Sequence, residues 1–260
     1  MNSLNFIAEN IDIYVLVFAR LAGIVFMNPI LSKSTIPAAL KTGIVLCTTA
    51  LITPVIPIPE GYTSGSFDFL LSFGKEIFVG FLLGYVFNIF YYMLMTAGDI
   101  LDTNFGFAMA KVFDPATSIQ SAFSSNLMNA LFILYFFATD SHLTLISVAV
   151  SSFDFVPVGL NGFSVMSAAT FAIDLFSSTF ALAMKLAIPF IAAEFILEVS
   201  MGILMKLIPQ IHVFVIEFQL KILLAIVMLM IMANPIAVFI DNYISLIFDN
   251  MKGALESVIK

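Results

Sequence analysis

Long apolar runs alternate with short polar stretches along this chain, and six such runs can be distinguished. They cover approximately residues 11–31, 37–58, 69–97, 126–150, 165–199 and 211–248. Only helices and closed barrels satisfy the backbone in lipid, and these runs lack the strict alternation that barrel strands show. The pattern therefore predicts an all-α fold made of polytopic, membrane-type helical hairpins.

Several of these predicted helices contain proline, which removes a backbone donor and clashes with the preceding turn. The prolines concerned are Pro29, Pro54, Pro57, Pro189, Pro209 and Pro235. We expect the region of Pro54 and Pro57 to end the second helix. In contrast, Pro235 is expected to bend the last helix rather than end it.

The composition agrees with residence in a membrane. Hydrophobic residues make up 61% of the chain and charged residues 10%, and the mean hydropathy is +1.09. Soluble proteins are roughly half apolar and a quarter charged. The net charge of −7 argues against a nucleic-acid partner, because phosphate binding relies on clustered Lys and Arg.

Residues suited to catalysis are scarce. Cys47 is the only cysteine, so an internal disulfide and a cysteine metal site are both excluded, and the two histidines are isolated from each other in sequence. The chain contains no HExxH, GxSxG or Walker motif. We therefore predict a protein that is not an enzyme and that holds no metal or cofactor.

Cations indicate an orientation, because short cytoplasmic loops are enriched in Lys and Arg. Three loops carry cations, at Lys33 and Lys41, at Lys111 and at Lys206, whereas the alternate loops carry only acids, at Glu60, Asp68 and Asp154. This distribution predicts an outside N-terminus. Six crossings would then leave Lys252 and Lys260 outside as well, so either the last segment re-enters or some helices do not cross.

Ionisable residues also lie inside the apolar runs. They are Arg20, Lys75, Glu76, Asp140, Asp174, Lys185 and Glu194. Each would cost about 2.5–3.5 kcal/mol at a helix centre facing lipid, so we expect most of them to face protein, water or one another. Pairing within the chain and pairing with other subunits are both open. The GxxxG spacing of Gly80 and Gly84 is typical of closely packed membrane helices.

The stretch of residues 97–118 differs from its surroundings. It interleaves charged residues with large apolar ones: Asp99, Asp102, Lys111 and Asp114 with Phe105, Phe107, Met109 and Phe113. A solvated connector is one interpretation, but aromatic residues are poorly accommodated in water. The alternating spacing favours an extended or irregular segment that is buried in protein or lines a cavity.

A second polar interruption separates the last two apolar runs. Lys206 and the pair Pro209–Gln210 predict a helical hairpin turn, and Glu217 and Lys221 are spaced to form an i, i+4 ion pair. A polar hairpin tip at the membrane surface is the simpler interpretation of this stretch.

The order of these features resembles the FliR family of flagellar biosynthetic proteins, the counterpart of the export-gate T subunit of virulence type III secretion systems. The resemblance covers essentially the whole chain. It rests on Arg20, Asn28–Pro29, Pro37, Pro54, Glu76, Gly80, Gly84, the stretch "AGDILDTNFGFAMAKVFDP", His142, Ser152–Phe153, Pro157, Gly202 and Pro209–Gln210. The chain departs from the family pattern at Lys206, Glu217 and Gln219, where Arg, Gly and Pro are usual.

The resemblance implies a single-copy core subunit of the flagellar type III export gate in the bacterial inner membrane. With FliP and FliQ it would form a cone-like helical assembly around a closed pore for unfolded flagellar proteins, and FlhB would engage that gate. Residues 1–125 would form N-terminal helical hairpins that end in a pore-facing plug loop, 97–118. Residues 126–260 would complete one integrated membrane domain in contact with lipid and include a FliQ-like hairpin, 165–260.

Two groups of site residues follow from this interpretation. The plug would comprise Phe105, Gly106, Phe107, Met109, Lys111, Phe113, Asp114 and Pro115. Contacts with other subunits would involve Arg20, Glu76, Asp174, Lys185, Glu194, Lys206, Pro209, Gln210, Glu217 and Lys221. The alternative is an ion- or proton-coupled secondary transporter, in which intramembrane acids such as Asp174 and Glu194 would mark an ion path.

Overall fold

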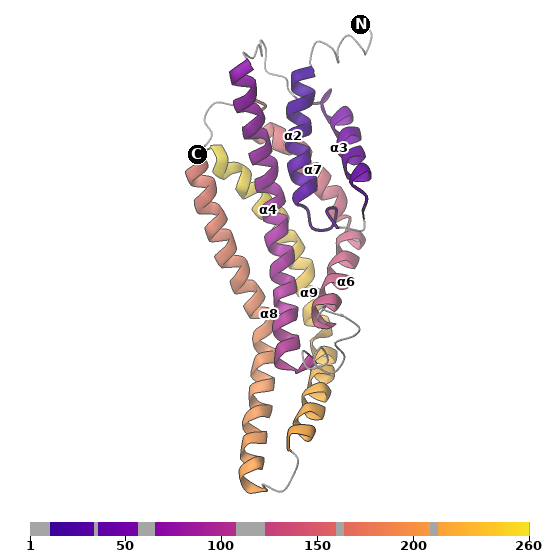
Figure 1. Cartoon of the computed structure of the whole chain (residues 1–260), viewed down its shortest axis with the longest axis vertical. Helices are drawn as coiled ribbons and strands as arrows, with labels where there is room; N and C mark the ends of the chain where they lie inside the picture. Colours follow the sequence, from indigo (N-terminus) through magenta and orange to yellow (C-terminus); the bar gives the residue numbers. More distant parts are fainter. Residues whose placement is uncertain are drawn as a thin grey trace. The chain divides into compact units, whose positions relative to one another are not determined.

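The computed structural model describes residues 11–33, 36–56, 66–107, 123–159, 164–208 and 213–259. Within these ranges the chain forms helices and no strand, which confirms the all-α prediction. In chain order the helices are α2 (Ile11–Met27), α3 (Ala38–Ile52), α4 (Ser66–Asn104), α6 (Phe123–Ala138), α7 (Ser141–Phe155), α8 (Val165–Leu207) and α9 (Val213–Ile259) (Figure 1).

Two differences from the predicted helix boundaries bear on the sites described below. α4 continues to Asn104, seven residues beyond the expected end at Ala97, so the first part of the predicted plug loop is helical. The fourth apolar run is divided between α6 and α7 at Asp140, whose φ of 54° lies in the left-handed region. A helix cannot continue through that conformation, and aspartate is one of the few residues with a side chain that adopts it.

The last two helices contain proline, and a further proline follows the end of α2. Pro189 and Pro235 lie inside α8 and α9, and both helices continue past them, so Pro235 does not end the last helix, as predicted. Near the N-terminus, Asn28–Pro29 follows the end of α2. There the Asn28 side-chain oxygen accepts hydrogen bonds from the amides of Ile30 and Leu31, at 2.9 and 3.2 Å, which satisfies donors in the turn.

Three of the described helices, α4, α8 and α9, are long and apolar enough to cross a membrane, and α6 with α7 would make a fourth crossing as one broken span. This is the arrangement of a multi-pass membrane protein. Four crossings are two fewer than the six apolar runs of the sequence, because α2 has only 17 residues and α3 only 15. At 1.5 Å per residue, helices of these lengths fall short of the roughly 30 Å of a bilayer core.

The chain divides into two compact units that interleave along the sequence. Unit 1 takes Met1–Tyr91, Thr139–Ser177 and Ile244–Lys260, and unit 2 takes Tyr92–Ala138 and Ser178–Tyr243. Among the described residues, unit 1 therefore holds α2, α3 and α7, unit 2 holds α6, and α4, α8 and α9 contribute to both.

Unit 1 depends on a close crossing of α2 and α4. A methyl group at Gly23 would lie 2.8 Å from the carbonyl carbon of Gly80, and one at Gly80 would collide with the carbonyl oxygen of Arg20. Glycine is thus required on both helices where their backbones touch. The GxxxG spacing in α4 serves packing inside the chain, and this crossing places Arg20 beside α4.

Candidate functional site

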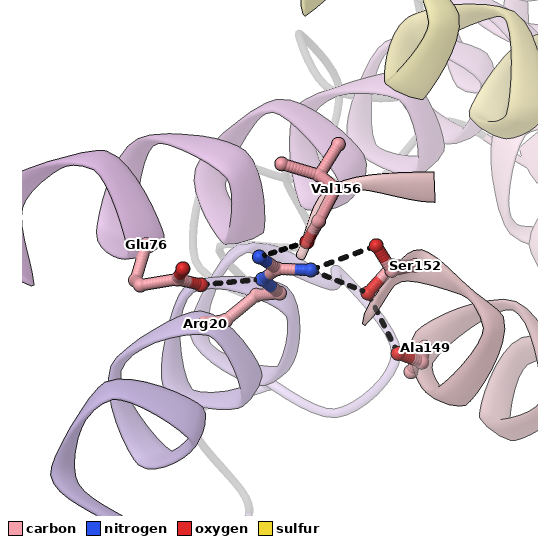
Figure 2. A network of polar contacts seen from close by, with 5 residues as sticks. All are labelled: Arg20, Glu76, Ala149, Ser152 and Val156. Carbon is pink, nitrogen blue, oxygen red and sulfur yellow. Dashed lines mark hydrogen bonds and ion pairs between the residues drawn. The ribbon is translucent and has the colours of Figure 1, made fainter. Parts of the chain in front are cut away.

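The first candidate site is a polar network buried in unit 1. Arg20 on α2 is fully buried, and its Nε donates to Oε2 of Glu76 on α4 at 2.6 Å. Its Nη1 donates to the backbone oxygen and the hydroxyl of Ser152, at 2.8 and 3.3 Å, and its Nη2 donates to the backbone oxygen of Val156 at 2.7 Å (Figure 2). We call Arg20, Glu76, Ser152 and Val156 the Arg20 network.

The guanidinium suits this position because it carries five donors in a planar fork. Ser152 and Val156 lie at the C-terminal end of α7, where the Ser152 carbonyl oxygen also accepts the amide of Val156 at 2.9 Å. A cation there also interacts favourably with the helix dipole. The aromatic ring of Phe153 covers the guanidinium, with 4.1 Å from Cζ to the ring centre. Arg20 thereby joins α2, α4 and α7.

Arg20 and Glu76 were expected to contact other subunits, and the structure differs. Their exposed fractions are 0% and 3%, and they pair with each other inside the chain. Neither side chain offers a surface that a second protein could reach. The reason is the glycine-mediated crossing of α2 and α4, which brings the two helix backbones into contact beside the pair.

The second candidate site is an ionic cluster in unit 2. The ammonium of Lys221 on α9 lies 2.8 Å from Glu194 Oε1, 2.9 Å from Glu198 Oε1 and 3.2 Å from Glu217 Oε1. Since an ammonium has three N–H donors, one can point at each carboxylate. We call these four residues the Lys221 cluster. It confirms the predicted i, i+4 pair of Glu217 and Lys221.

The charges of the Lys221 cluster do not cancel. One ammonium against three carboxylates leaves a net charge of −2. The exposed fraction rises from 6% at Glu194 to 25% at Glu217 and 50% at Glu198. Glu198 was not among the predicted site residues. It follows Glu194 by four residues, a spacing that places both side chains on the same face of a helix. This cluster leaves negative charge available at the surface.

The third candidate site joins the end of α4 to the start of α6. The Asp102 carboxylate is buried, and its two oxygens accept the amide of Ser124 at 3.0 and 3.1 Å. The hydroxyl of Ser125 lies 2.7 Å from the Met95 carbonyl oxygen and 2.7 Å from Asp99 Oδ1, and its single proton serves one of them at a time.

The two helix ends approach at backbone distance. A methyl group at Gly98 would lie 2.6 Å from the Cα and the amide nitrogen of Ser125. We call Gly98, Asp99, Asp102, Ser124 and Ser125 the stem contact. None of its members was predicted as a site residue, since the partners come from opposite ends of a long intervening segment.

Three predicted plug residues lie within the described part of the chain. Phe105 is buried, with its ring edge-on to that of Phe190 at 6.1 Å between centres. Gly106 follows with a φ of 73°, which confirms an irregular backbone at this point. Phe107 is half-buried and its ring lies 5.6 Å from that of Phe123. Met109, Lys111, Phe113, Asp114 and Pro115 lie outside the described residues.

The other predicted contact residues are not brought together. Asp174, Lys185 and Lys206 are exposed, and none makes an ion pair with another residue that the structure describes. Pro209 and Gln210 lie outside the described residues. Of the predicted contact set, Arg20 pairs with Glu76, and Glu194, Glu217 and Lys221 form a second group.

This chain is similar over most of its length to known bacterial proteins. Residues 11–247 match the family "Bacterial export proteins, family 1". The flagellar biosynthetic protein FliR of Bacillus subtilis is 26% identical over 257 residues, 98% of this chain and 99% of the relative. FliR of Escherichia coli is 28% identical over 249 residues, 95% of this chain and 94% of the relative.

A secretion protein is similar as well. The Yop proteins translocation protein T of Yersinia pestis is 29% identical over 221 residues, 84% of each chain. The family match takes in the Arg20 network, the stem contact and the Lys221 cluster. From its end-to-end match to bacterial export proteins, this chain belongs to the FliR family.

Proposed function

We propose that this chain is the single-copy core subunit of the flagellar type III export gate in the bacterial inner membrane. There it forms, with FliP and FliQ, the closed pore through which unfolded flagellar proteins are exported, and FlhB engages that gate. The coarser statement follows from the family alone: the chain is a component of a flagellar or type III export apparatus. The finer assignment to a gate with FliP and FliQ is argued from the exposed apolar surface of α8 and α9.

The observation that carries this proposal is the bare apolar surface of α8 and α9. In the most apolar 18-residue window of each helix, 28% of the residues of α8 and 11% of those of α9 are buried inside the chain, against 61% for α4. Isolated proteins rarely leave apolar surface of this extent in water. Either lipid or neighbouring helices must cover these two helices.

The Lys221 cluster favours neighbouring proteins over lipid alone as the cover. It places a net charge of −2 on the same two helices, and Glu198 is half exposed there. A carboxylate facing hydrocarbon at mid-depth costs about 2.5–3.5 kcal/mol, and lipid tails offer no partner. A neighbouring helix with an apolar face and a Lys or Arg side chain satisfies both the surface and the charge. Residues 165–260 would take the FliQ role in this arrangement.

Co-purification tests the assignment directly. The tagged chain is extracted in mild detergent from cells that contain FliP and FliQ, and the mass of the complex is measured. We expect both partners in one particle, far heavier than the 28.5 kDa of this chain alone. Recovery of the chain by itself, with ion-coupled solute uptake after reconstitution in liposomes, would instead establish the transporter alternative.

The same proposal assigns the closure of the pore to residues 106–115. Its support within the described residues is the local geometry: Phe105 is anchored in unit 2, and Gly106 then turns the backbone out of the helix. Phe107, Met109 and Phe113 would supply the apolar contacts, because flexible Met and aromatic side chains fill irregular gaps and yield without specific recognition.

Deletion of residues 106–115 tests this closure. We expect the assembled gate to conduct ions across the inner membrane, because the apolar collar would be missing. The measurement is membrane conductance or loss of the ion gradient in cells, with the amount of assembled gate quantified in parallel. An assembled complex with unchanged conductance contradicts the closure.

A further inference from the structure

One side of α8, within unit 2, is exposed and combines apolar, charged and glycine positions. At about 100° per residue, the six residues concerned fall within about 120° of the helix circumference, and Gly202 lies at the centre of that arc. They are the exposed residues Phe195, Glu198, Val199, Gly202, Met205 and Lys206. We call this set the Gly202 face.

Gly202 has no packing role among the residues that the structure describes. A methyl group at Gly202 would meet none of their atoms within 4 Å, whereas a methyl group at Gly23 or Gly80 would collide with a neighbouring backbone. Glycine is also among the least favourable residues inside a helix. The packing described for this chain therefore gives no reason for a glycine here. A second helix would, because glycine lets two helix backbones approach closely.

The two charged residues of the Gly202 face lie on either side of its centre. Glu198 comes four residues before Gly202 and Lys206 four residues after it, so the two charged positions are about 12 Å apart along the helix axis. Glu198 belongs to the Lys221 cluster, which carries an excess of two negative charges. Lys206 makes no ion pair with another described residue. A complementary surface needs a cation near Glu198 and a carboxylate near Lys206.

Lipid suits the adjoining side of α8 better than it suits the Gly202 face. Ile196, Ile203 and Leu207 are exposed on that adjoining side, which holds no charged residue between positions 195 and 207. Hydrocarbon offers no partner to a carboxylate or an ammonium. Both exposed charges of this stretch gather around Gly202, and this arrangement favours a protein partner there.

We propose that the Gly202 face docks one helix of a neighbouring subunit, which crosses α8 at Gly202 with a small residue of its own. The docked helix places a Lys or Arg side chain against Glu198 and an Asp or Glu side chain against Lys206. Gly202 sets the separation of the two helices, and the order of the charges sets their register. This inference rests on the proposed function and deepens it, because it specifies the surface and the chemistry of the subunit contact.

An alanine substitution separates docking from folding by the sign of two effects. Gly202→Ala adds a methyl group for which the chain has room and introduces a better helix former, so the full chain in detergent should unfold at the same or a higher temperature. The same methyl group holds the docked helix away. We expect about tenfold less FliP and FliQ to be retained on the tagged chain, as is usual for overpacking of a close contact.

Gly74→Ala is the matched control for this substitution. Gly74 is exposed, lies in a helix of unit 1, and a methyl group there also meets nothing within 4 Å among the described residues. The chemical change is the same, but the position is outside the Gly202 face. We expect Gly74→Ala to leave retention of both partners unchanged.

Photo-crosslinking tests which side of α8 is covered without altering Gly202. A photoreactive benzoylphenylalanine replaces Phe195 or, as the control, Ile196. The two side chains are equally exposed, at 62% and 67%, but Ile196 lies about 120° from the centre of the Gly202 face. We expect a several-fold higher yield of crosslink from position 195 to a gate partner that is identified by mass.

Reversal of one charge tests the charge order of the docked helix. Lys206→Glu would place a carboxylate against the expected acid, so we expect several-fold lower retention of the partners at low salt and a smaller difference at high salt. Lys252→Glu makes the same change at an exposed lysine of unit 1 and is the control. Equal retention in the two variants would contradict the proposed charge pairing.

The results decide the inference as follows. Lower retention with Gly202→Ala, together with preferential crosslinking from position 195, supports it. Unchanged retention with Gly202→Ala, or equal crosslinking from both positions, overturns it. A crosslink from position 195 only to lipid, or only to a second copy of this chain, overturns it as well. If Gly202→Ala lowers the unfolding temperature, the crosslinking pair decides, because both of its chains keep Gly202.

Failure of this inference is distinguishable from failure of the proposed function. An unaltered chain that co-purifies with FliP and FliQ, and a Gly202→Ala chain that retains them equally well, reject the docking surface alone. An unaltered chain that retains neither partner rejects the proposed function, and the docking surface falls with it.

Discussion

The Arg20 network and the Lys221 cluster both place ionic groups on apolar helices. The two sites differ in how far the charges are balanced and shielded from solvent within the chain. Arg20 and Glu76 are a neutral pair, nearly inaccessible to solvent, and the other two guanidinium nitrogens donate to Ser152 and Val156. The Lys221 cluster carries two uncompensated negative charges, and half of Glu198 is exposed.

This difference shows that an ionic residue in an apolar helix can serve either the fold of a single chain or a contact with another molecule. A saturated, buried network such as that of Arg20 acts on the fold of the single chain, because no other molecule can reach it. An unsaturated, partly exposed cluster has charge left over for another molecule, which in the proposed gate is a neighbouring subunit. Burial and charge balance, rather than the presence of a charge, separate the two roles.

The largest expected effect comes from breaking the Arg20 network. Arg20→Met leaves the Glu76 carboxylate buried without its cation and removes the donors to the end of α7. We expect a loss of about 3–5 kcal/mol in the free energy of unfolding. Thermal or denaturant unfolding of the purified protein in detergent measures it.

The matched control removes both charges. Arg20→Met combined with Glu76→Met leaves no buried unpaired charge, so we expect it to recover much of the lost stability. A double variant as unstable as Arg20→Met alone would mean that the network contributes through packing of the arginine stem and not through its charges.

A smaller effect is expected at the centre of the Lys221 cluster. Lys221→Met leaves three carboxylates without their shared cation, but Glu198 and Glu217 are partly exposed and water replaces some of the lost contacts. We expect a loss of about 1–3 kcal/mol, mainly from the buried Glu194. Unfolding is measured as before, and Lys221→Met with Glu194→Gln should restore part of the loss. No loss in either variant would contradict the described geometry.

The smallest effect on stability is expected at Glu198, where the change should act on assembly. Glu198→Gln removes one half-exposed charge, which is worth less than about 1 kcal/mol to the fold. We expect weaker retention of FliP and FliQ at low salt and a flatter dependence of retention on salt, because exposed ionic contacts are screened. Glu256→Gln, an exposed position in unit 1, is the control. Retention identical to that of the unaltered chain at every salt concentration would remove Glu198 from the interface.

Local spacing predicted those contacts whose partners are near in sequence. Glu217 and Lys221 form the expected i, i+4 pair, and the irregular backbone was expected where Gly106 now shows a positive φ. The extension of α4 to Asn104 was not predicted, because Asp99 and Asp102 look like loop residues until Ser125 and Ser124 are seen opposite them.

The sequence by itself determined the helical class, the membrane character and the family, because each rests on runs of consecutive residues or on motifs read in order. Only the tertiary structure decided which charges are closed inside the chain. Arg20 finds its partners 56, 132 and 136 residues away, and the glycines of α2 and α4 bring the first of them into reach. Pairings at such separations follow from the packing of whole helices, which no local spacing encodes.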